Sequence, residues 1–172
     1  LLLGGADEAD LMDRIARACP DAPVHRPDGA QPLGVFAGLI ERCAAVLTGD
    51  EQIRRRPSGQ LAAALNDLGA SVRSTRANGC APFVVEGVLR GGITAIEAVS
   101  SQFLTSLLIN APLADGDSHI RVPVLNEQPY VEITLDWLKH EGIVLERDDL
   151  REFRISGGQR YRAFDRRIPG DF

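Results

Sequence analysis

Two segments of the chain repeat one pattern, and this repeat limits the folds that are open to the sequence. Residues 57–72 and 129–144 each open with a proline, carry apolar residues at helical spacing, and then have a glycine before an apolar strand. The apolar positions are Leu61, Leu65 and Leu68 in one copy and Ile133, Trp137 and Leu138 in the other. Gly69 and Gly142 are the expected ends of the two helices. The run 7–24 is interpreted as a third, eroded copy. Such a unit completes its core by packing against its siblings.

The rest of the chain alternates helical and strand patterns, which predicts an α/β fold throughout. The predicted helices span residues 7–19, 32–44, 57–68, 100–111 and 129–141. The segment 100–111 is apolar nearly all round, so we expect this helix to be buried. The run 119–124 alternates apolar and polar residues, as a strand with one wet face does, and Pro123 predicts an edge position or a strand end.

Composition excludes several classes of protein. With 172 residues, 44% of them hydrophobic, we expect one compact domain with an aliphatic core. No apolar run approaches the ~20 residues that cross a bilayer, and no signal segment opens the sequence. A net charge of −5 argues against wrapping nucleic acid. Three cysteines without metal-ligand spacing predict neither a disulfide framework nor a zinc site, and a reducing cytoplasm fits best.

Two segments carry candidate anion-binding groups. Ser100, Ser101 and Gln102 lie at the predicted junction between a strand and the apolar helix. The first N–H groups of a helix have no partner within the helix and favour binding of an anion. The simpler interpretation is an ordinary helix cap. Upstream, Arg54–Arg56 precede Pro57, which suits the first turn of a helix. The simpler interpretation there is a solvated surface. If both segments bind anions, the chain has two anionic reactants.

Four segments, in order and spacing, resemble the enolpyruvyl transferases. They are residues 48–57, 99–105, 128–132 and 157–161. The resemblance is strong over 48–172 and implies two domains, each an inside-out α/β barrel of three βαβαββ units with helices buried and sheets outward. Residues 1–172 would then be most of the first domain, without the second. The Ser-Ser-Gln triplet favours the shikimate branch, whose acceptor is shikimate 3-phosphate.

The resemblance also implies roles for individual residues. Ser100, Ser101 and Gln102 would bind the phosphorylated acceptor, and Gln102 would also lie near phosphoenolpyruvate. Arg56 matches an arginine that clamps phosphoenolpyruvate, which suits its planar fork of donors. Tyr130 matches a tyrosine beside the acceptor ring, although a packed aromatic plug is the equal alternative.

The same resemblance implies addition and elimination without a metal or other cofactor. The family's catalytic lysine and lysine-serine motif would precede Leu1, and its catalytic aspartate would lie in the second domain. No catalytic residue is therefore expected in this chain, which should be inactive by itself.

Two departures from the family pattern leave the acceptor open. The run 28–35 lacks the arginine and threonine of a phosphoenolpyruvate cradle. Glu127 stands where the family has a serine on the acceptor phosphate, so either Glu127 points away or the acceptor carries its charge elsewhere. A nucleotide acceptor, of the UMP or UDP-N-acetylglucosamine type, would account for both departures. A non-catalytic ligand-binding or scaffold homologue is the alternative from another class.

Overall fold

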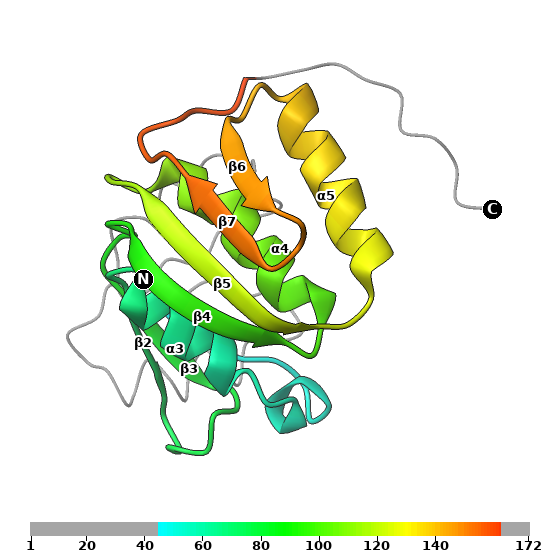
Figure 1. Cartoon of the computed structure of the whole chain (residues 1–172). Coiled ribbons are helices and arrows are strands. Elements are labelled where there is room, and N and C mark those ends of the chain that lie inside the picture. The colour runs from blue at the N-terminus through cyan, green and yellow to red at the C-terminus, as the bar shows by residue number, and fades with distance from the viewer. Residues whose placement is uncertain (1–44, 163–172) are drawn as a thin grey trace. The chain divides into compact units, whose positions relative to one another are not determined.

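The structure is a computed structural model that describes residues 45–162 (Figure 1). These residues fall into two compact units, which divide between Val88 and Leu89. The predicted helices 7–19 and 32–44, the proposed third copy 7–24 and the divergent run 28–35 lie outside the described residues. That residues 1–172 form one domain stays a prediction.

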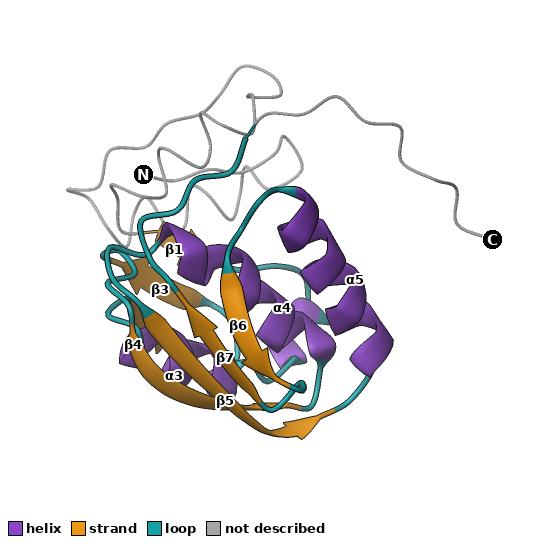
Figure 2. Cartoon of the chain, turned by 45° about the horizontal axis from the view of Figure 1, so that its top comes forward, coloured by secondary structure: helices purple, strands orange, loops and turns teal. Residues whose placement is uncertain are grey.

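The second unit has the order β-α-β-α-β-β. Its elements are β4 (Gly92–Ala98), α4 (Ser101–Asn110), the short 3-10 helix η3 (Ala111–Leu113), β5 (Ser118–Leu125), α5 (Gln128–His140), β6 (Leu145–Asp148) and β7 (Glu152–Ile155). The sheet order is β4-β5-β7-β6, with β4 parallel to β5 and β7 antiparallel to both of its neighbours. Helices α4 and α5 pack against each other beside this sheet (Figure 2). This is the βαβαββ unit that the family resemblance implies.

The described part of the first unit repeats the last four elements of that pattern, β-α-β-β. It contains β1 (Ala45–Leu47), the 3-10 helix η2 (Ile53–Arg55), α3 (Gly59–Asp67), β2 (Ser71–Ser74) and β3 (Phe83–Glu86). Its antiparallel sheet has the order β1-β3-β2, as β5, β7 and β6 do in the second unit. The repeat predicted over 57–72 and 129–144 is therefore confirmed as the segments α3–β2 and α5–β6.

Glycine ends both repeated helices in the same way. Gly69 and Gly142 have φ values of 97° and 75°, a backbone region that is nearly free of cost only for glycine. The amide after each glycine donates to the carbonyl five residues earlier, at 3.1 Å after Gly69 and 2.9 Å after Gly142. This is the Schellman arrangement, which pairs carbonyls that the helix end would leave unbonded.

The core of the second unit lies between its sheet and α4. Leu104, Leu107 and Leu108 are fully buried, as predicted for this apolar helix. Phe153 and Ile155 reach the core from β7 and are equally inaccessible. Complete burial of such a side chain contributes roughly 1.5–3 kcal/mol, so this layer fixes α4 relative to the sheet.

Two expectations about the helices need correction. Helix α3 begins at Gly59 with Ser58 as its N-cap, so Pro57 lies before the helix and not in its first turn; it forms an isolated bridge with Cys80 instead. In α5 the buried residues are Val131, Leu135 and Leu138. Ile133, which helical spacing assigns to the apolar face, is 54% exposed.

Strand β5 carries Pro123 at a local irregularity. The pairing of β5 with β7 covers residues 118–121 only, and the register with β4 shifts between Ala95 and Glu97. Two residues of β5, Val122 and Pro123, therefore lie opposite the single residue Ile96 of β4, and this two-to-one pairing is a β-bulge. Pro123 has no N–H to donate, and a bulge two residues before the strand end accommodates it. The strand is internal over residues 118–121, but at Pro123 it pairs with no residue of β7, so Pro123 lies near the strand end and at a local edge.

Candidate functional site: a polar cavity where two helices begin

The candidate site residues of the second unit gather at one edge of its sheet. Strands β4 and β5 are parallel, so their carboxyl ends lie at the same edge, and α4 and α5 both begin there. Each helix start offers unpaired N–H groups and a partial positive charge. A cavity of about 470 Å³ lies between the two starts. It is lined by Ser101, Gln102, Thr105, Glu127, Tyr130 and Thr134.

The start of α4 is built without a side-chain cap. Ser100 is the N-cap residue, with an extended backbone (φ −120°, ψ 130°), and its carbonyl accepts the Phe103 N–H at 3.1 Å. Its hydroxyl makes no capping hydrogen bond to the helix. The ordinary-cap interpretation of the Ser-Ser pair is therefore not what this structure shows, and the Ser100 hydroxyl is left for another partner.

Ser101 and Glu127 join the two helix starts. The Ser101 side chain is almost completely buried, at 3% exposure, and its Oγ donates to Glu127 Oε2 at 3.0 Å. Glu127 is the N-cap residue of α5, but its carboxylate makes no capping bond to its own helix. Its backbone is left-handed, with φ 56° and ψ 46°. Of the two alternatives for Glu127, the structure shows the carboxylate lining the cavity and not turned away.

Tyr130 and two threonines complete the wall. Tyr130 is 62% exposed, which rules out the packed-plug interpretation. The Thr134 hydroxyl donates to the Tyr130 carbonyl at 3.1 Å and lies 3.3 Å from the Thr105 hydroxyl across the two helices. Sequence reasoning missed both threonines. Each lies four residues after a predicted site residue, Ser101 or Tyr130, so helical spacing alone would have placed them on the same face.

Arg56 belongs to the first unit. Its two neighbours are engaged locally: Arg55 Nη2 donates to Glu51 Oε1 at 2.7 Å, and Arg54 Nε donates to the Asp50 carbonyl at 3.3 Å. Arg56 is exposed at the end of η2 and forms no ion pair within residues 45–162. Within the described residues, two arginines of the triplet are therefore held by the loop, and Arg56 has no ion-pair partner.

The segment 157–161, one of the four family-like motifs, has a structural role. A Cβ on Gly157 would lie 2.3 Å from the Gly116 carbonyl oxygen, so only glycine fits this contact. The Gly158 N–H donates to the Ala114 carbonyl at 2.7 Å, and the Tyr161 hydroxyl donates to the Ile109 carbonyl at 2.7 Å. These bonds tie the segment to the end of α4 and to the turn that follows it.

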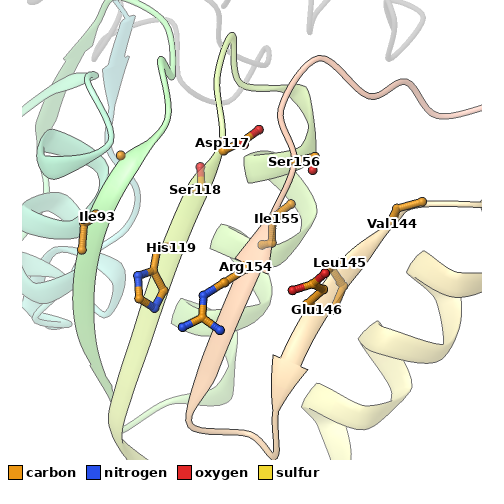
Figure 3. Close-up of a pocket in the computed structure, with 11 residues that line it drawn as sticks. Ile93, Asp117, Ser118, His119, Val144, Leu145, Glu146, Arg154, Ile155 and Ser156 are labelled. Carbon is orange, nitrogen blue, oxygen red and sulfur yellow. The ribbon is translucent and has the colours of Figure 1, made fainter.

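A second cavity, also of about 470 Å³, lies on the other face of the same sheet, around His119 and Arg154 (Figure 3). The His119 ring bonds to the Glu152 carboxylate, and Arg154 Nη2 lies 3.2 Å from the same carboxylate. His119 and Arg154 are thus both engaged by Glu152, and no helix begins among the lining residues. The cavity between α4 and α5 is therefore the stronger candidate for an anionic reactant.

Within residues 45–162 no group of three His, Cys, Asp or Glu side chains is placed to hold a metal ion. None of the helices there is long and apolar enough to cross a membrane.

Comparison with known proteins gives one family. A family model described as EPSP synthase (3-phosphoshikimate 1-carboxyvinyltransferase) matches residues 30–172. The 3-phosphoshikimate 1-carboxyvinyltransferase of Acetivibrio thermocellus is 51% identical over 139 residues, which cover 81% of this chain and 33% of that protein. The enzyme of the same name from Ruminiclostridium cellulolyticum is 44% identical over 160 residues, which cover 90% and 38%.

A comparison of the fold with solved structures also finds EPSP synthases. The structure of EPSP synthase from Acinetobacter baumannii matches with a TM-score of 0.60 at 21% identity, over 75% of this chain and 29% of that one. This likeness confirms the predicted fold class. The chain spans about a third of the length of the relatives it matches. Because the family model covers most of its residues, the chain belongs to the EPSP synthase family.

Proposed function

We propose that the protein containing this chain transfers the enolpyruvyl group of phosphoenolpyruvate to a hydroxyl of shikimate 3-phosphate. Membership of the EPSP synthase family supports this reaction. The observation that carries the chain's part in it is the polar cavity where α4 and α5 both begin. Two helix starts and several polar side chains around one cavity suit an anionic, polyhydroxylated acceptor.

The described residues would divide the two reactants between them. Ser100, Ser101 and Gln102 would contact the acceptor phosphate at the start of α4, and Tyr130 would flank the acceptor ring. Arg56 would hold phosphoenolpyruvate, since its guanidinium can donate to two oxygens of a carboxylate or phosphate at once. Gln102 would lie near both reactants.

The proposed chemistry balances as an addition followed by an elimination. The acceptor hydroxyl gives up its proton to a base as its oxygen bonds to the central carbon of phosphoenolpyruvate, and the terminal carbon gains a proton from an acid. Loss of a proton from that terminal carbon, and of inorganic phosphate from the central one, then restores the double bond. Donors aimed at the phosphate and carboxylate stabilise the developing charge. The groups that move the protons would lie outside this chain, so we expect the chain alone to be inactive.

The remaining partners follow from the same proposal. A second domain would supply the groups that this chain lacks, and neither a metal nor a nucleic acid would take part. We also propose a cytoplasmic location, which the unpaired thiol of Cys80 supports.

Phosphate release by the full-length protein tests this proposal. The protein should release inorganic phosphate from phosphoenolpyruvate only when shikimate 3-phosphate is present. Release that depends on UMP or UDP-N-acetylglucosamine would refute the choice of acceptor. No release with any of the three, together with no binding, would refute the enzymatic interpretation and favour a scaffold homologue.

One observation favours the nucleotide acceptor as a second candidate. The Glu127 carboxylate lines the cavity where the family's acceptor phosphate is expected. A phosphate placed beside it is repelled by on the order of several kcal/mol when the pair is partly desolvated. An acceptor that carries its charge elsewhere would avoid this cost, and the three-acceptor comparison above distinguishes it.

A further inference from the structure

The hydrogens of the serine and threonine hydroxyls in the cavity are already assigned by the hydrogen bonds that the structure contains. A hydroxyl has one hydrogen to donate. Ser101 gives its hydrogen to Glu127 Oε2, and Thr134 gives its hydrogen to the Tyr130 carbonyl. In the contact between the two threonines, Thr105 must then be the donor. The Ser101 and Thr105 oxygens therefore offer only lone pairs to a ligand, as the Glu127 carboxylate does.

Glu127 occupies the position at which an anionic ligand would be most favoured. The starts of α4 and α5 both attract negative charge, and the Glu127 carboxylate reaches from the N-cap of α5 to the first residue of α4. It does this from a left-handed backbone, which is strained in a residue that has a Cβ. Strain of this kind persists where the surrounding structure holds the residue in place, and such residues gather at functional sites.

We propose that Glu127 determines the specificity of the cavity as a built-in anion that competes with a ligand phosphate for the Ser101 hydroxyl. In the observed state Ser101, Thr105 and Glu127 favour ligand groups that donate hydrogen bonds, such as hydroxyls. A phosphate gains the Ser101 hydroxyl only after the Glu127 carboxylate has turned away. The identity of the phosphorylated acceptor rests on the proposed function, but the competition for Ser101 does not.

Binding of inorganic phosphate to the full-length protein, measured by calorimetric titration, tests this competition without any turnover. Glu127→Gln removes the charge, and Glu127→Gly removes the side chain while relieving the left-handed backbone, so that it keeps the fold. Both variants should bind phosphate about tenfold more tightly, or better, than the unaltered protein. Asp136→Asn, on the same helix but outside the cavity lining, is the matched control and should leave phosphate affinity unchanged.

A second substitution tests whether the additional phosphate affinity arises at Ser101 in the cavity. Adding Ser101→Ala to the Glu127→Gln variant should abolish the gain in phosphate affinity. Phosphate affinity that is unchanged or lower in both Glu127 variants would overturn the proposal. A gain that survives Ser101→Ala would overturn it as well, because the anion would then be elsewhere.

A parallel titration separates this inference from the proposed function. If the acceptor is shikimate 3-phosphate, Glu127→Gly should also tighten its binding about tenfold. If the variants gain affinity for inorganic phosphate while shikimate 3-phosphate neither binds nor reacts, the competition stands and the proposed acceptor is wrong.

Discussion

Replacing Gly157 with alanine tests how closely the segment 157–161 is packed against the turn after α4. The new Cβ would lie 2.3 Å and 2.5 Å from the carbonyl oxygen and carbon of Gly116, and 2.7 Å from the Ala114 carbonyl oxygen. All three are backbone atoms, so no flexible side chain can give way. The backbone of Gly157 itself is not left-handed, and the cost of the substitution is therefore one of contact alone.

The structure gives the size of this cost. Either the turn or the segment must shift, and the shift strains the 2.7 Å bond from the Gly158 N–H to the Ala114 carbonyl. Losing such a bond costs about 0.5–1.5 kcal/mol. Overpacking a site that cannot relax adds about 1–3 kcal/mol. We expect Gly157→Ala to lower the free energy of unfolding by about 3 kcal/mol.

Gly158→Ala is the matched control at the next residue. Gly158 has φ 68°, but no neighbouring atom lies within 4 Å of the place that an alanine Cβ would take, so alanine there meets strain without a clash. The expected cost is about 1–2 kcal/mol. Urea unfolding of the full-length protein and of both variants measures the two costs. A Gly157→Ala variant as stable as the Gly158→Ala variant, or more so, would refute the argument from close contact.

Two further predictions concern a tyrosine and an arginine. Burial, with a smaller effect from Glu141, raises the pKa of Tyr161 from 10.0 to about 12. The unfolded chain therefore loses this proton first, so the contribution of the protonated Tyr161 to stability is complete below pH 10.0 and is lost as the pH rises towards about 12. Across this range the free energy of unfolding should fall less steeply with pH for Tyr161→Phe than for the unaltered protein. Equal slopes would contradict the assignment. Arg56→Ala should raise the KM for phosphoenolpyruvate about tenfold or more, whereas Arg55→Ala, whose guanidinium is held by Glu51, should change it less than about twofold. Equal effects of the two arginine variants in steady-state kinetics would contradict that distinction.

The local framework of this protein is readable from its sequence because it depends on contacts between near neighbours. The stops at Gly69 and Gly142 follow from the left-handed helix end that favours glycine. The burial of α4 follows from its apolar sequence. The position of Pro57 does not follow from local pattern, because Ser58 takes the cap position while Pro57 pairs with Cys80, which is distant in sequence.

The candidate site is predictable in part. The residues at the start of α4 can be named because a strand-to-helix junction is visible in the sequence, and Tyr130 because of its motif. The direction of Glu127 cannot be predicted, since it depends on a left-handed backbone at one residue and on a partner 26 residues away. The segment 157–161 is the opposite case. Its motif groups it with the binding segments, and only the tertiary structure reveals that it secures the end of α4.

The most direct test of the proposed acceptor cavity is calorimetric titration of the full-length protein with shikimate 3-phosphate, before and after Ser101→Ala. The substitution is made in the Glu127→Gly background, because in the unaltered protein Ser101 exchanges the Glu127 carboxylate for the phosphate and its loss would largely cancel. In that background, loss of one hydrogen bond to a charged group costs about 1.5–3 kcal/mol, so Ser101→Ala should weaken binding about 10- to 100-fold. Ser106→Ala in the same background, on the same helix but outside the cavity lining, should bind as the Glu127→Gly variant does. Equal affinity in the Ser101 and Ser106 variants would contradict the assignment of the cavity between α4 and α5 to the acceptor.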